Sequence, residues 1–184
     1  MEDKNRKILV KNRSAATVIV EVPNRNIRVV LQPGQVISNL TFGDVEEFSY
    51  IPGGDTILRE YLQLSEADIN NLNIGKPELE YSYSEKDIVD LMKSGSLDAF
   101  LDCLDFAPTG VIDLIKKFAV DLPLTDTEKL DALKEKTGFD AVAAIRHKKE
   151  EEEDGTAAGA AKPTRRVTTE QTTTPTTGRR VIKK

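Results

Sequence analysis

Residues 95–145 read GSLDAFLDCLDFAPTGVIDLIKKFAVDLPLTDTEKLDALKEKTGFDAVAAI, and this stretch decides the fold of the second half of the chain. Its apolar residues recur every three or four positions, as they do on one face of a helix. Residues that cap or stop helices divide the pattern into short pieces. Helices of two or three turns are marginal alone, so they must pack on one another. Residues 84–149 are therefore predicted to form a small helical domain.

The predicted helix boundaries follow from residues that satisfy free backbone groups at helix ends. Ser84 and Ser96 are predicted N-caps, and Gly95 is predicted to end the helix between them. Pro108 suits the first turn of a third helix, which Pro123 stops. The remaining boundaries are predicted at Thr125 with Glu128, which together form a capping box, at Gly138, at Asp140 as an N-cap, and at Ile145.

The first half of the chain has the features of β-structure. Short runs rich in Val and Ile alternate with turn residues, and Pro33-Gly34 favours a type II turn. Consecutive strands with tight links pair as hairpins, so a small antiparallel sheet is predicted. The predicted strands are residues 7–10, 17–22, 27–31 and 35–40.

Helical spacing replaces the β-pattern from Asp44 onward. We expect one helical turn, a hinge at Gly53-Gly54, and a short helix whose apolar stripe covers the open face of the sheet. The glycine pair is interpreted as a turn, because it lacks the Lys and Ser/Thr of a nucleotide-binding loop. The predicted stripe consists of Ile57, Leu58, Tyr61 and Leu62.

These patterns predict an α+β protein: a small antiparallel β N-terminal domain followed by a small helical domain and a disordered basic tail. The β domain with its covering helix is assigned to residues 1–64 and the helical domain to 84–149. Residues 65–83 are assigned to a connector, with Tyr81 and Tyr83 packing at the junction. Residues 150–184 are assigned to a flexible tail rich in Thr and Pro.

The chemistry of the chain changes near Lys149. No large apolar residue lies between Lys149 and Val167, so this segment buries too little surface to offset the entropy of ordering, roughly 1–2 kcal/mol per residue. Residues 1–147 carry 17 Lys/Arg and 25 Asp/Glu, a net charge of −8, whereas residues 155–184 carry a net charge of +6. An acidic body with a basic end predicts that the tail is the part that binds a partner.

Two similar basic clusters in the tail are the candidate partner-binding residues. Arginines of this kind pair with carboxylates while a neighbouring Val or Ile fills an apolar notch or adds a strand to a sheet edge. They also contact phosphates, so nucleic-acid binding through the tail alone stays open as an alternative. Repeated clusters on a flexible linker raise avidity on a symmetric assembly. The candidates are Arg165, Arg166, Val167, Arg179, Arg180, Val181, Ile182, Lys183 and Lys184.

The residues needed for catalysis or metal binding are sparse. Cys103 is the only cysteine and lies between leucines of an amphipathic helix, while the only histidine, His147, lies among basic residues at a helix end. Asp98, Asp102 and Asp105 share one helical face, but acidic residues opposite an apolar stripe are typical of any solvated helix. We therefore predict a protein that is not an enzyme, with no catalytic residue, no metal site and no cofactor.

Location is indicated by what the chain lacks. The N-terminal residues MEDKNRK are charged and lead into a β-like run, which does not fit a secretion signal. No apolar run approaches the length of a transmembrane helix. We expect a protein that is made in the cytoplasm, is not secreted by a signal peptide and does not contact a membrane.

Residues 95–145, together with LQPGQVI at 31–37 and YIPGGDTILREYL at 50–62, resemble small proteins encoded by tailed bacteriophages. The resemblance implies a virion-associated or assembly protein that decorates or joins parts of a capsid, neck or tail. Its partners would be capsid, portal or tail proteins in a symmetric assembly, and its location would be the virion. The alternative hypothesis is a nucleic-acid-associated regulatory or packaging protein whose basic tail contacts phosphates.

Overall fold

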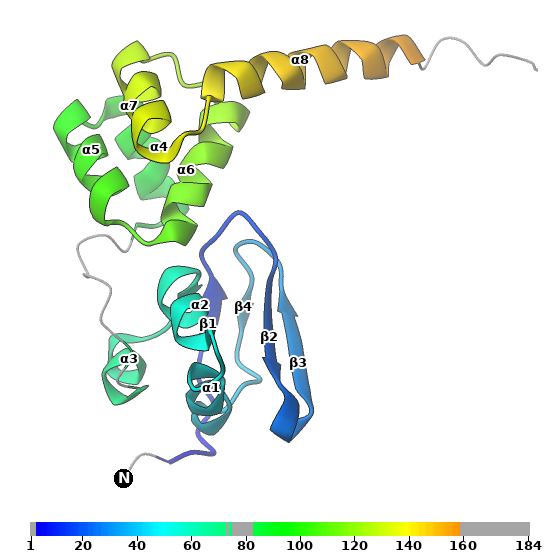
Figure 1. The fold of residues 1–184 in the computed structure, drawn as a ribbon, viewed down its shortest axis with the longest axis vertical. Coiled ribbons are helices and arrows are strands. Elements are labelled where there is room, and N and C mark those ends of the chain that lie inside the picture. Colours follow the sequence, from blue (N-terminus) through cyan, green and yellow to red (C-terminus); the bar gives the residue numbers. More distant parts are fainter. Residues whose placement is uncertain (1–2, 73, 75–82, 159–184) are drawn as a thin grey trace, which may run out of the picture. The chain divides into compact units, whose positions relative to one another are not determined.

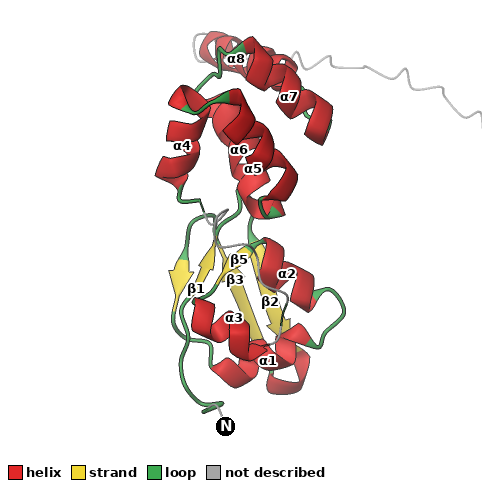
Figure 2. Cartoon of the chain, turned by 90° about the vertical axis from the view of Figure 1, so that its left-hand side faces the viewer, coloured by secondary structure: helices red, strands yellow, loops and turns green. Residues whose placement is uncertain are grey.

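The computed structural model describes residues 3–72, 74 and 83–158 of the 184 (Figure 1). The chain divides into two units, Met1–Lys149 and Glu150–Lys184. In the first unit, short antiparallel strands and their helices precede a set of helices without strands, as Figure 2 shows by colour. The predicted α+β class is confirmed for the part of the chain that the structure describes.

Within the described residues, five short strands form two small sheets. Strand β1 (Val10–Asn12) lies between β4 (Val36–Ile37) and β5 (Leu62–Gln63) and is antiparallel to both. Strands β2 (Val18–Val22) and β3 (Ile27–Leu31) form a separate hairpin, closed by the short 3-10 helix η1 (Pro23–Arg25). Residues that alternate along β2 point into the core, so this strand has one buried and one exposed face.

The prediction that neighbouring strands pair as hairpins is wrong for all pairs except β2 and β3. The first strand begins at Val10, and its partners come from positions far along the chain. Asn12 ends β1, and its side-chain oxygen accepts from the amide of Ser14 to turn the chain there. The turn at Pro33-Gly34 is confirmed: the Gln35 amide bonds to the Gln32 carbonyl, and Gly34 has a φ of 71°.

Three helices accompany the strands: α1 (Phe42–Ser49), α2 (Gly54–Glu60) and α3 (Glu66–Leu72). Helix α2 ends before Leu62, which pairs in β5 instead of extending the predicted apolar stripe. Helix α3 lies where the sequence analysis placed a connector, and its Leu72 belongs to the first core. Tyr83 packs against the second core, and the position of Tyr81 lies outside the described residues.

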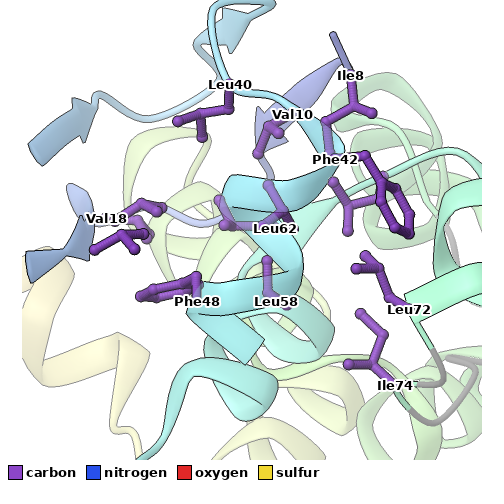
Figure 3. Close-up of a cluster of buried hydrophobic side chains, with 14 of the residues drawn as sticks. Ile8, Val10, Val18, Leu40, Phe42, Phe48, Leu58, Leu62, Leu72 and Ile74 are labelled. Atoms are coloured by element: carbon purple, nitrogen blue, oxygen red, sulfur yellow. The ribbon is translucent and has the colours of Figure 1, made fainter. Parts of the chain in front are cut away.

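The first hydrophobic core gathers side chains from the strands and from α1–α3. Figure 3 shows Phe48 of α1 beside Val18 of β2 on one side of this core. Leu58 and Leu62 lie in the middle of the view, and Leu72 and Ile74 lie on the other side. The buried members are Ile8, Val10, Val18, Val20, Val22, Leu31, Leu40, Phe42, Val45, Phe48, Leu58, Leu62, Leu64, Leu72 and Ile74.

Most of the second core comes from α4 (Glu85–Ser94), α5 (Leu97–Phe106), α6 (Thr109–Asp121) and α7 (Thr127–Thr137). Ser84 and Ser96 cap α4 and α5 as predicted, and Gly138 ends α7 with a positive φ. The core consists of Ile88, Leu91, Met92, Phe100, Cys103, Leu104, Ala107, Val111, Leu114, Ile115, Ala119, Leu124, Ala132, Leu133 and Ala141.

Two predicted boundaries differ from the structure. Helix α7 is capped by Asp126, whose carboxylate accepts from the amides of Glu128 and Lys129, and not by Thr125. Asp140 caps α8 (Ala141–Ala158) as expected, but this helix continues beyond Ile145 into the segment we predicted to be flexible. Glu and Ala are strong helix formers, and extending an existing helix needs no new nucleus.

Candidate functional site

The nine tail residues predicted to bind a partner, Arg165, Arg166, Val167, Arg179, Arg180, Val181, Ile182, Lys183 and Lys184, lie outside the described residues. A candidate site must therefore be sought elsewhere in the described part of the chain. The feature that stands out is a groove in the first unit, beside the start of β2.

This edge groove, as we call it, is a cavity of about 220 Å³ between β2 and α2. Its walls are residues 16–19, with Ile57 and Tyr61 from the end of α2. Ala16 and Thr17 precede β2, at the end of a bend, and Val18 and Ile19 are its first two residues, so the cavity lies at the start of the strand. No residue of β3 contributes, which places the groove on the edge of β2 that faces away from its hairpin partner.

An apolar pair adjoins the groove on the outer face of the hairpin. Ile19 and Val30 are directly opposite each other in β2 and β3, and their side chains are 42% and 44% exposed. Polar pairs flank them: Thr17 donates to Gln32 at 3.1 Å on one side, and Glu21 lies 3.8 Å from Arg28 on the other. Ile19 thus lines the groove and faces solvent, whereas Val30 only faces solvent.

Asn12 holds the strand edge of the groove in place. Its fully buried side chain donates to the carbonyls of Ala16 at 2.7 Å and Leu31 at 3.1 Å, and accepts from the amide and hydroxyl of Ser14 at 2.9 Å. These bonds link β1 to the residues just before β2 and at the end of β3. Within the described residues, β1 has no backbone strand pairing with this hairpin. Asn12 thus adds polar contacts to the shared core in holding the strand edge of the groove.

Arg13 fixes the other wall of the groove. Its backbone amide bonds to the carbonyl of Tyr61 at 3.0 Å, and its guanidinium donates to the carbonyl of Arg59. The side chain is buried, and its Nε is the one buried side-chain nitrogen or oxygen without a hydrogen-bond partner among the described residues. Burial lowers the pKa of Arg13 to about 10, and the charge of nearby Glu60 opposes this shift.

Lys129 is the most deeply buried cation of the helical part. Its ammonium group donates to the carbonyls of Leu91, Met92 and Gly95 at 3.1, 3.0 and 2.7 Å, which satisfies all three of its donors. These carbonyls end α4, where a helix dipole favours positive charge. The ammonium group of Lys129 therefore caps the end of α4.

Among the residues considered for catalysis, Cys103 is buried and Asp105 forms an ion pair. Cys103 is buried, and this burial, with Asp102 nearby, raises the pKa of its thiol to about 12. Asp105 pairs with Lys136 at 2.7 Å on the outside of the helices. Within the described ranges, no group of three or more His, Cys, Asp or Glu side chains could hold a metal ion.

Two further cavities open between helices of the second core. One, of about 240 Å³, lies between α4 and the loop before α7, and is lined by Val89, Met92 and Lys93 with residues 122–126. The other, of about 280 Å³, lies between α7 and the start of α8. Two of the acidic side chains that line them, Asp126 and Asp140, cap helices.

Sequence reasoning missed the edge groove. The available signal was Ile19, an apolar residue at an outward-facing position of an alternating strand. The search of family models finds no match for the chain, and no curated protein or solved structure matches it either. Among the described helices, none has both the length and the apolar character that crossing a membrane requires.

Proposed function

We propose that this protein is a non-enzymatic structural or adaptor component of a bacteriophage virion, attached to capsid, neck or tail proteins through its C-terminal segment. The resemblance of residues 31–37, 50–62 and 95–145 to small phage proteins supports the virion as its location. The contrast between the acidic body and the basic end supports attachment through that end.

The buried charged side chains of the described residues support a structural role most directly, because each of them fastens parts of the fold. Asp44 bonds to Arg25 at 2.7 Å and completes the cap of α1, and Asp68 binds Arg6 at 2.5 Å. Arg13 and Lys129 bind backbone carbonyls, as described above. All four of these side chains therefore take part in contacts that hold the fold together.

The test compares the full chain with a chain that ends at Ala158, which retains α8. Both are produced in cells that assemble the particles, and each is quantified in purified particles by mass spectrometry. We expect the full chain to be incorporated and the shortened chain to be lost. Equal incorporation of the two would disprove attachment through the C-terminal segment.

A salt titration separates protein docking from phosphate contact. Docking on a protein should fail when Arg165, Arg166, Arg179 and Arg180 are replaced by Ala, and should require a defined partner. Phosphate binding would accept any duplex and weaken steeply between 50 and 200 mM salt. That second outcome would replace the adaptor proposal with the nucleic-acid-associated alternative.

A further inference from the structure

The edge groove has the form of an acceptor for an extended chain. Within the described residues β2 pairs only with β3, so its other edge carries backbone groups that no strand uses. The groove begins beside Ala16 and Thr17 and reaches Val18 and Ile19, the first two residues of β2, whose side chains point to opposite faces of the strand. An added strand would gain backbone hydrogen bonds from the edge and would bury side chains on both faces.

The occupant of such a groove needs two adjacent apolar side chains, because neighbours in a strand point to opposite faces. Residues 159–184 contain three large apolar side chains, Val167, Val181 and Ile182, and only the last two are adjacent. Both are β-branched, which suits a strand. Basic residues surround them, whereas residues 1–147 carry a net charge of −8.

We propose that residues 178–184 of one copy add as a strand to the free edge of β2 in a second copy. Residues 159–184 reach roughly 85 Å when extended at about 3.3 Å each, which is ample for contact between copies. The inference rests on the proposed function, in which the C-terminal segment is the point of attachment. It adds that one partner of the segment is another copy of the same chain.

Disulfide trapping between two full-length variants tests the register directly. One chain carries Ile182→Cys and the other carries Ile19→Cys, with Val30→Cys as the matched control because its exposure is nearly the same. A strand added to β2 lies about 5 Å from Ile19 but about 10 Å from Val30, and a disulfide needs Cα atoms within about 7 Å. Cys103 is buried and does not compete.

We expect crosslinked dimers with Ile19→Cys and at least tenfold fewer with Val30→Cys. Equal yields from the two positions, or no dimer from either, would overturn the proposal. A second measurement uses no cysteine: Ile19→Lys should weaken self-association in sedimentation at least tenfold, and Val30→Lys should leave it unchanged. Both side chains are exposed, so the fold tolerates both substitutions.

The two proposals fail in different ways. If the Ile19→Lys chain self-associates like the unsubstituted chain, the edge groove is not the acceptor, even when loss of residues 159–184 still prevents incorporation into particles. If the chain ending at Ala158 is incorporated normally, the attachment function itself is wrong. A chain with Val181→Asp and Ile182→Asp should behave like Ile19→Lys in sedimentation, and normal self-association of that chain would also refute the inference.

Discussion

The carboxylate of Glu60 accepts hydrogen bonds from both the backbone amide and the hydroxyl of Thr109, at 2.9 and 3.1 Å. Thr109 is the first residue of α6, and the N-cap residue Pro108 provides no side-chain cap. A residue at the end of α2 therefore provides the hydrogen-bond acceptor for a free backbone amide at the N-terminus of α6, a helix of the second core. Gly110 permits this approach, because a Cβ there would lie 2.9 Å from the Glu60 carbonyl oxygen.

Replacing Glu60 with Gln should reduce the free energy of unfolding by about 1 kcal/mol at neutral pH, because the amide loses the charge that favours a helix N-terminus. Urea denaturation measures the change. Glu21→Gln is the control, since Glu21 is exposed and lies 3.8 Å from its basic partner. If both substitutions reduce the free energy of unfolding by the same amount, the contact between Glu60 and Thr109 does not contribute to stability.

Stability should also depend on the protonation of Glu60. Burial acts to raise its pKa, but hydrogen bonds from Thr109 and Arg59 outweigh burial and bring the pKa below the usual 4.5. The unfolded state therefore binds more protons, so the stability from this group is present above about pH 5 and is lost as the pH falls through the folded-state pKa. Denaturation midpoints between pH 3 and 6 should show a smaller loss on acidification in Glu60→Gln than in the unsubstituted chain.

Asn12→Ala should destabilise the protein by about 3 kcal/mol, because it leaves the carbonyls of Ala16 and Leu31 and the amide of Ser14 without their partner. The exposed Asn5→Ala is the matched control and should change stability by less than about 0.5 kcal/mol. Chemical denaturation followed by circular dichroism measures both. A loss for Asn12→Ala as small as that of the control would show that the two sheets are held together by other means.

Lys129→Met retains most of the volume of the side chain but removes the ammonium group that caps α4. Three buried or partly buried carbonyls then lack a donor, and we expect a loss of about 3 kcal/mol. Lys117→Met, at an exposed position of α6, should be nearly neutral. Thermal unfolding of the two variants in parallel gives the comparison, and similar melting temperatures would contradict the assigned role.

Gly53 and Gly54 should respond differently to Ala. A Cβ at Gly54 would lie 1.9 Å from the carbonyl oxygen of Phe48, so Gly54→Ala should unfold or severely destabilise the first core. Gly53 has a φ of 83° and open space around it, so Gly53→Ala should cost only about 1 kcal/mol of backbone strain. Soluble yield and unfolding midpoints test this order. If Gly53→Ala were the more destabilising of the two, the close approach of the Phe48 carbonyl to Gly54 would not be the reason that position 54 requires glycine.

The helical half was readable from the sequence because its signals are local. Ser84, Ser96, Gly138 and Asp140 act within three or four residues of their own positions, and the structure places all four at helix ends. Thr125 failed because Asp126, one residue later, competes for the same amides with a charged oxygen.

The β half was harder to predict because its pairing is not local. Nothing near Val10 in the sequence indicates that β1 pairs with β5, since this choice is made by burial of both strands in one core. Helix α3 was also not predictable, because most of its residues are polar and only two of them, Asp68 and Leu72, are buried. The edge groove depends on these long-range contacts, so the sequence could indicate only Ile19.

The pairing of β1 with β5 has a consequence for biosynthesis. A ribosome that has released only the first strands has not yet made Leu62, Leu72 or Ile74, which complete the first core. Until then the apolar side chains of the β2–β3 hairpin stay exposed to water. The later helices, in contrast, pack against helices that are close to them in sequence and can do so as they emerge. The nascent N-terminal half is thus the stage at which chaperones would matter most for the yield of this protein.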